Sequence, residues 1–444
     1  MKKVLIISYY WPPCGGIGVL RCLKIAKYLR QFGWEPVIFT AENAHYPSYD
    51  ETNFKDIPEG VTVLKQPIFE PYRYYKAFTG KAKDANVNAA LTTDPDKGSF
   101  KHKLSVFIRS NFFIPDARAY WIKPSVKYLK KYLKENPVDA LFSDGPPHSN
   151  TMIACQLKEQ LGIPWLADFQ DPWTQVDYFQ ELILTPWGRK KHHRLEQRAF
   201  RNADKMTIVS KRWKKDLESI GAKNVSVIPW GFDEEDYQDL TPNPDSMFTL
   251  THAGLLGDDR NPEALFEAFS ILNQEIEGFQ ENSRIRLIGQ VDKLVVAAAE
   301  KQGVRQQLQL IEQVDRKTAI QFCANSQVLL LLLNKAANAY GRIPGKLFEY
   351  LAVNRPILCL GPQESDVHDI LQSRHAGVLE EYRNPQAIAR RVKVFYEEFQ
   401  TTGKVSNTTQ GISQYSIKHL TGKIAGMLED IRKSTSTDQR PVKP

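Results

Sequence analysis

The residues best suited to bind a phosphorylated ligand lie in one short segment of the second half of the chain. Lys346 and Glu349 are three residues apart, so they share a face of a helix that begins after Pro344-Gly345. A lysine is suited to phosphate, and a carboxylate can accept hydrogen bonds from ribose hydroxyls. Glu349 lies among apolar residues, where a carboxylate usually has a specific partner. The alternative is a simple ion pair between the two side chains.

Two glycine-containing turns each follow an apolar segment and precede a helical pattern. The first is Gly15-Gly16-Ile17-Gly18, and the second runs from Gly254 to Arg260. Glycine lets a ligand approach the backbone, and a helix N-terminus favours negative charge. The Arg260 guanidinium suits a diphosphate because it donates in a fixed fork; a surface arginine is the alternative. A nicotinamide-dinucleotide fingerprint fits poorly, since Arg21 stands where the third glycine is needed.

Two polar segments in the first half follow predicted strands. They are 143–149, which includes His148, and 168–173, which begins at Asp168. The carboxyl ends of parallel strands meet at one edge of a sheet, so both segments point toward that edge. We expect His148 or Asp168 to contact a sugar. The alternatives are a helix-start residue for His148 and a structural cap for Asp168.

Short apolar strands alternate with amphipathic helices through both halves of the chain. This alternation predicts parallel sheets with helices on both faces, which is an α/β fold. At 444 residues the chain is longer than one core usually supports, so we expect more than one domain. The apolar run 328–333 is the length of a strand and is typical of one buried on both faces.

Charge and cysteine content narrow the classes of partner. A net charge of +8 indicates an anionic partner, and an ordinary basic surface is the alternative. Lys and Arg form no single long stripe, which argues against nucleic acid. The five cysteines are scattered and form no CxxC pair, which argues against a disulfide framework or a zinc site. The sequence contains no signal peptide and no membrane-spanning window, so we expect a cytoplasmic location.

Two segments fall outside the strand–helix rhythm. Residues 72–103 are polar and read as a long loop, within which Asp94 and Asp96 form a DxD match. We interpret that match as a solvated turn, so no metal site is predicted. The segment 433–444 is rich in Ser, Thr, Lys and Pro and is expected to be a disordered tail.

Taken in order, these pieces resemble glycosyltransferase family 4, and the resemblance spans nearly the whole chain. The segments that carry it are Tyr9–Pro13 with Gly15-Gly16, Ala203-Asp204 before Val209-Ser210, 228–233, 254–268, and Lys346 through Ala352 before Pro356.

The resemblance implies a GT-B fold, in which two Rossmann-like domains with parallel sheets face each other across a cleft. An N-terminal acceptor domain would cover residues 1–228, a nucleotide-sugar domain 238–410, and a helix at about 416–432 would pack back on the first domain. It implies a retaining transfer from a nucleotide sugar, which is a substrate, to a glycan or lipid-linked acceptor in surface polysaccharide synthesis, with no separate cofactor and no obligate metal. The residues implied for catalysis are Arg260, Lys346, Glu349 and His148, and those for donor binding are Gly15, Gly16, Gly254, Asp168, Arg260, Lys346 and Glu349.

Three family positions differ in this chain. The first acidic residue of the family's E-x7-E motif falls on Gly341, and one of its two cations falls on Leu255. The family's sugar-side histidine has no single match, because Ser143, Asp144 and His148 compete for it. Two alternatives stay open: a nucleotide-sugar epimerase of the same fold, and a nucleotide-sugar-binding subunit that has lost catalysis.

The stretch 100–134 combines many lysines with aromatic residues and few acids. Such a segment can lie on an anionic bilayer, which would place the protein at the inner face of the membrane beside a lipid-linked acceptor. The alternative is an ordinary amphipathic helix whose Val126, Leu129 and Leu133 face the core.

Overall fold

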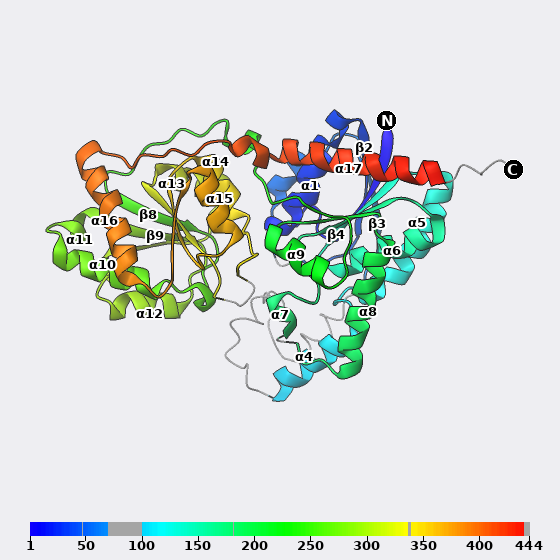
Figure 1. The fold of residues 1–444 in the computed structure, drawn as a ribbon, viewed down its shortest axis with the longest axis horizontal. Coiled ribbons are helices and arrows are strands. Elements are labelled where there is room, and N and C mark those ends of the chain that lie inside the picture. Colours follow the sequence, from blue (N-terminus) through cyan, green and yellow to red (C-terminus); the bar gives the residue numbers. More distant parts are fainter. Residues whose placement is uncertain (47, 70–99, 181, 336–338, 439–444) are drawn as a thin grey trace. The chain divides into compact units, whose positions relative to one another are not determined.

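The computed structural model describes residues 1–46, 48–69, 100–180, 182–335 and 339–438 (Figure 1). The chain divides into two compact units. Unit 1 comprises Met1–Pro229 and Lys418–Pro444, and unit 2 comprises Trp230–Ile417. Unit 1 is therefore built from two separate parts of the sequence, and unit 2 is continuous.

Unit 1 contains a parallel sheet in the order β3-β2-β1-β4-β5-β6-β7. Its strands are β1 Lys2–Ile7, β2 Trp34–Ala41, β3 Thr62–Gln66, β4 Ala140–Gly145, β5 Trp165–Phe169, β6 Lys205–Ile208 and β7 Val225–Val227. Its α-helices are α1 Ile17–Leu29, α4 Phe100–Phe112, α5 Ile122–Glu135, α6 His148–Leu161, α7 Asp177–Gln180, α8 Pro186–Asn202, α9 Lys211–Ser219 and α17 Ile417–Asp438. Three 3-10 turns, η1 Arg30–Phe32, η2 Glu51–Asp56 and η3 Ala119–Trp121, complete its described elements.

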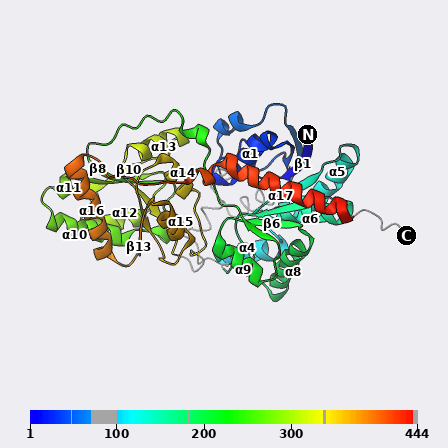
Figure 2. The same cartoon turned by 45° about the horizontal axis from the view of Figure 1, so that its top comes forward.

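Helix α17 completes one face of unit 1. Its apolar side chains Leu420, Ile424 and Leu428 are buried in one cluster with β1 and α1. The helix lies beside α1 in both views (Figures 1 and 2). Residues 433–438 continue this helix, which corrects the disordered tail predicted from 433 onward; 439–444 lie outside the described residues.

Unit 2 contains a second parallel sheet in the order β10-β9-β8-β11-β12-β13. Its strands are β8 Phe248–Ala253, β9 Ser283–Ile288, β10 Leu308–Ile311, β11 Val328–Leu332, β12 Ile357–Leu360 and β13 Gly377–Glu380. Its α-helices are α10 Glu263–Glu275, α11 Phe279–Asn282, α12 Lys293–Lys301, α13 Arg316–Asn325, α14 Lys346–Val353, α15 Asp366–Arg374 and α16 Pro385–Thr402. Its described 3-10 turns are η4 Glu234–Tyr237, η5 Asp258–Arg260, η6 Arg305–Gln307 and η7 Ile412–Tyr415.

The sheet of unit 2 is covered on both faces, as strand β11 illustrates. Leu330 and Leu332 belong to the cluster that contains α10, α12 and α16. Leu329 and Leu331 belong to the cluster that contains α13, α14 and α15. Because successive side chains of a strand point to opposite faces, a continuous apolar run is what such a strand requires.

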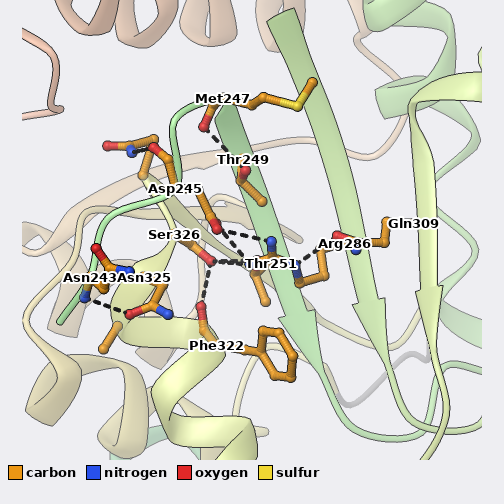
Figure 3. A network of polar contacts seen from close by, with 12 residues as sticks. Asn243, Asp245, Met247, Thr249, Thr251, Arg286, Gln309, Phe322, Asn325 and Ser326 are labelled. Carbon is orange, nitrogen blue, oxygen red and sulfur yellow. Dashed lines mark hydrogen bonds and ion pairs between the residues drawn. The ribbon is translucent and has the colours of Figure 1, made fainter. Parts of the chain in front are cut away.

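A network of polar contacts connects the residues that precede β8 to β9, β10 and α13 (Figure 3). The Arg286 guanidinium on β9 donates to both carboxylate oxygens of Asp245, at 2.8 and 3.1 Å, and to Gln309 Oε1 at 2.9 Å. Its guanidinium carbon also lies 5.1 Å from the centre of the Phe322 ring. The network fixes β9, β10 and α13 on one another.

The chain enters and leaves unit 2 at adjacent places. Phe232 N–H donates to the Tyr415 carbonyl at 3.1 Å, and Ile417 N–H donates to the Phe232 carbonyl at 2.9 Å. The predicted loop 72–103 is corrected at its end, where residues 100–103 belong to α4; residues 72–99 lie outside the described residues.

Candidate functional site

The order of the strands creates a switch point in unit 2 between β8 and β11, where ligands of open α/β sheets bind. Gly254 follows β8 with a φ of 115°. Gly289, after β9, has a φ of 110°, and a Cβ on it would lie 3.2 Å from the backbone carbon of Gly254. Both turns therefore require glycine.

Lys346 reaches this edge from the first residue of α14. Its Nζ lies 3.3 Å from His252 Nε2. A Cβ on Gly254 would lie 2.5 Å from the same Nζ, so the lysine crosses the glycine where any other residue would collide with it. Burial, with the nearby Arg260, lowers the pKa of Lys346 to about 8, although Glu349 opposes the shift.

Two further cations lie on the adjoining turn. Arg260, at the end of η5, has a side chain 26% exposed and contacts Asp259 at 3.3 Å. Lys335, which follows β11, donates to the Asn261 carbonyl at 2.9 Å, and its N–H donates to the Asp259 carbonyl. The turn thus brings Arg260 and Lys335 together, beside the acidic Asp258 and Asp259.

Glu349 lies one turn along α14 and is held from another helix. The Arg316 guanidinium donates from Nε and Nη2 to Glu349 Oε1, at 3.1 and 3.0 Å. Arg316 also pairs with Asp236 at 2.5 Å. The simple pair between Lys346 and Glu349 is not observed, since each charged group has a different partner.

The corresponding edge of unit 1 is closed by internal contacts. Asp168, at the end of β5, is buried and forms a bidentate pair with Arg21, at 2.5 and 2.8 Å. Thr207 also donates to its Oδ1, at 2.5 Å. Asp168 therefore serves as an internal ion-pair partner, which differs from the ligand contact predicted from the sequence.

Asp144 ends β4 in the same buried region. Ser8 Oγ donates to its Oδ2 at 3.0 Å, and Gln170 donates to its Oδ1. Burial, with the Asp168 carboxylate nearby, raises the pKa of Asp144 to about 7. Ser143 accepts a hydrogen bond from the Trp165 indole at 2.9 Å, so both of these polar residues have partners within unit 1.

His148 begins helix α6 and is 6% exposed. Its ring stacks on Trp173 with centres 4.3 Å apart. Burial, with His192 nearby, lowers the pKa of His148 to about 3, so the imidazole is neutral. Its Nε2 is buried and has no hydrogen-bond partner among the residues that the structure describes. Ser143, Asp144 and His148 compete for the sugar-side position. Among the described residues, His148 is the one of these three with a buried polar side-chain atom that has no hydrogen-bond partner.

The first glycine turn is packed against its own chain. A Cβ on Gly15 would lie 3.0 Å from Ser48 Oγ, and Gly15 N–H donates to the Ser48 carbonyl. Gly16 is exposed, has a φ of 80° and precedes α1. The packing and conformation of the loop therefore account for both glycines without a ligand.

Two of the positions that depart from the family pattern, Leu255 and Gly341, carry no charged side chain. Leu255 is 51% exposed, and Gly341 is buried. Asp94 and Asp96 lie outside the described residues. Within the described ranges, no group of three or more His, Cys, Asp or Glu side chains is arranged to hold a metal ion.

Sequence reasoning missed three polar residues that organise the site of unit 2: His252, Arg316 and Lys335. The position of His252 inside the buried strand 248–253 could have identified it from the sequence, because a buried polar ring requires hydrogen-bond partners. No sequence pattern connects Arg316 with Glu349, since the two meet only when α13 packs on α14.

This geometry agrees with the comparison to known families. The model of Glycosyltransferase Family 4 matches residues 15–236, half of the chain. The chain therefore belongs to glycosyltransferase family 4, and its two Rossmann-like sheets form the GT-B fold. Comparison with curated proteins gives no match.

Solved structures share this fold at low sequence identity. Sucrose-phosphate synthase from Thermosynechococcus elongatus aligns with a TM-score of 0.57 at 11% identity over 98% of both chains. Anabaena HepE, in complex with UDP and glucose, aligns with a TM-score of 0.56 at 14% identity over 99% of both chains. The N-terminal domain of Candida albicans trehalose-6-phosphate phosphatase aligns with a TM-score of 0.61 at 11% identity over 97% of both chains.

Proposed function

We propose that this chain is a retaining, metal-independent glycosyltransferase that moves a sugar from a nucleotide donor to a glycan or lipid-linked acceptor of the cell surface. The observation that carries the proposal is the cationic edge of unit 2. Lys346 lies across Gly254 at the β8–β11 switch point, with Arg260 close enough to lower its pKa. Glu349 follows on the same helix, with two guanidinium bonds on its Oε1.

The chemistry of transfer explains this arrangement. Charge grows on the diphosphate as it leaves the sugar, and fixed cations in a partly buried site stabilise that charge. Lys346 and Arg260 would bind the diphosphate, and Glu349 would accept hydrogen bonds from the ribose. His148 is the proposed contact of unit 1 with the sugar, supported by its buried, unpartnered Nε2.

A panel of nucleotide sugars tests the donor site through thermal stability. A ligand that binds the folded state raises the unfolding temperature in proportion to RT ln(1 + [L]/Kd). UDP-sugars come first, because UDP or a UDP-sugar is bound in three structures of similar fold. Stabilisation by one donor supports the proposal, and no response to any donor refutes it. Conversion of the bound donor without an acceptor would indicate an epimerase instead.

The proposal of a lipid-linked acceptor draws support from the surface of unit 1. A groove of about 400 Å³ lies between α5 and α6 and is lined by five lysines of α5, with Val126, Gln156 and Gln160. The lysines are Lys123, Lys127, Lys130, Lys131 and Lys134. Leu129 and Leu133 are buried on the other side of α5, so the helix is amphipathic and its charged side is accessible. No helix in the described part of the chain is long and apolar enough to cross a bilayer.

Vesicle flotation tests this membrane contact. Binding should occur on vesicles of anionic phospholipid, weaken in high salt, and fall when Lys130, Lys131 and Lys134 are changed together to Glu. The matched control changes Arg383, Arg390 and Lys393 of unit 2 to Glu, which alters the net charge equally. Equal loss in both triple variants, or no binding of the native protein at low salt, would refute the contact.

A further inference from the structure

His252 is a buried histidine on β8, next to the candidate donor site. It is 1% exposed, and its Nδ1 lies 3.0 Å from the Leu330 carbonyl oxygen of β11. A carbonyl oxygen only accepts hydrogen bonds, so Nδ1 carries the hydrogen. In a neutral imidazole the other nitrogen is then an acceptor. His252 therefore offers Nε2 as an acceptor at the switch point between β8 and β11.

The group that meets this acceptor is the ammonium of Lys346. Its Nζ is 3.3 Å from His252 Nε2, and an ammonium can only donate. Gly254 leaves the space that Nζ and Cε occupy, since a Cβ there would lie 2.5 and 2.7 Å from them. The end of the lysine thus lies against both an imidazole and a glycine.

We propose that His252 is a positioning residue for Lys346, which it holds over Gly254 as a charged donor toward the diphosphate of the nucleotide sugar. The inference rests on the proposed function for its ligand, but the contact between His252 and Lys346 can be tested without one. His252 would act on the diphosphate only through its contact with the lysine, since the imidazole itself is uncharged.

The charges around the pair are consistent with this role. Burial, then the Lys346 ammonium and Arg260, lower the pKa of His252 well below its usual range, although the backbone of Leu330 and Leu255 opposes the shift, so the imidazole stays neutral. Lys346 faces Arg260 from η5, Glu349 from its own helix, Cys323 from α13 and His252 from β8. Burial and Arg260 disfavour the charged amine, so an acceptor at Nε2 stabilises it. Loss of that acceptor should lower the pKa of Lys346 further.

Two substitutions of similar size separate the two bonds of the imidazole. His252→Asn retains a donor at the position of Nδ1 but has no acceptor that reaches Lys346. His252→Gln places an amide oxygen near the position of Nε2. Competitive acetylation with acetic anhydride, followed peptide by peptide across pH, reports the pKa of Lys346 in the free protein. We expect a lower pKa in His252→Asn than in the native protein, with His252→Gln near native. Equal pKa values in all three proteins would overturn the inference.

Nucleotide binding gives the second measurement, with UDP, GDP, ADP and dTDP as the probes in calorimetry. His252→Asn should weaken binding of the preferred nucleotide roughly tenfold, the scale of one charged hydrogen bond. In a Lys346→Met background the same change should matter by less than about twofold, because two residues that act through one contact are not additive. Additive losses would show that His252 acts on the fold alone, and would overturn the inference.

The outcomes keep the two proposals apart. If the native protein binds none of the four nucleotides, the proposed donor site fails, and the acetylation profile still decides whether His252 controls Lys346. If nucleotides bind and His252→Asn is silent in both measurements, the donor site stands and the inference fails.

Discussion

Asp144 and Asp168 in unit 1 and Lys346 and Arg260 in unit 2 all lie at the carboxyl edges of parallel sheets. The carboxylates are buried and bound to Ser8, Gln170, Arg21 and Thr207 of their own unit. The cations keep part of their surface open, and Lys346 rests on a neutral imidazole rather than on a carboxylate. The two edges therefore differ in how their charges are satisfied: buried groups of the same unit enclose the carboxyl groups of unit 1, whereas Lys346 contacts a neutral ring and Arg260 pairs with the exposed Asp259.

The largest effect should come from breaking the closed edge. Asp168→Asn leaves the buried Arg21 guanidinium without its carboxylate, and removal of one partner of a buried pair costs about 3–5 kcal/mol of stability. Urea unfolding followed by tryptophan fluorescence measures the loss. The double variant Arg21→Met/Asp168→Leu should recover most of it. Native stability combined with lost nucleotide affinity would instead return Asp168 to the ligand site.

At the open edge, substitution should affect binding rather than folding. Arg260→Ala and Glu349→Ala should each weaken nucleotide-sugar binding by about 1.5–3 kcal/mol, the contribution of a hydrogen bond to a charged group. The unfolding midpoint of Arg260→Ala should stay close to that of the native protein, and Glu349→Ala should lose only the part-buried pair with Arg316, which keeps Asp236 as a partner. Calorimetry measures the affinities, with Arg390→Ala, an exposed arginine of α16, as the control. Unchanged affinity in both variants would remove these residues from the donor site.

An effect that is smaller per pH unit follows from the raised pKa of Asp144. The unfolded carboxyl ionises near its usual pKa of 3.8, whereas the folded one stays protonated up to about pH 7. Between these values the unfolded state binds fewer protons, so this group contributes stability at low pH that is lost as the pH rises toward 7. One proton limits the change to about 1.4 kcal/mol per pH unit. The stability of the native protein relative to Asp144→Asn should fall over pH 4–7 and then level; a constant difference would contradict this.

The smallest expected effect is none. If the cations of unit 2 stabilise the leaving diphosphate, sugar transfer should proceed at an unchanged rate in EDTA. It should also survive the change of Asp94 and Asp96 to Asn. The comparison is made with the identified donor and acceptor, with and without added manganese. Loss of transfer in EDTA that manganese restores would show that a metal supplies the charge.

Structural features that depend on local sequence patterns could be predicted from the sequence. The apolar run 328–333 gave the buried strand β11, and Gly254 with Lys346 marked the edge of its sheet. The side chains that pair with the candidate site residues could not be predicted in this way. Arg21 meets Asp168 across 147 positions and Arg316 meets Glu349 across 33, so both pairs depend on how the helices pack. The sequence therefore identified candidate side chains but could not tell which of them the fold neutralises.

The two-part construction of unit 1 has a consequence for how the chain is made. Residues 1–229 leave the ribosome long before α17, so the face that receives Leu420, Ile424 and Leu428 stays uncovered while unit 2 is translated. N-terminal domains generally fold first during synthesis, yet here unit 2 is the first to have all of its core residues available. Unit 1 of the nascent chain thus keeps an exposed apolar face until α17 has been synthesised.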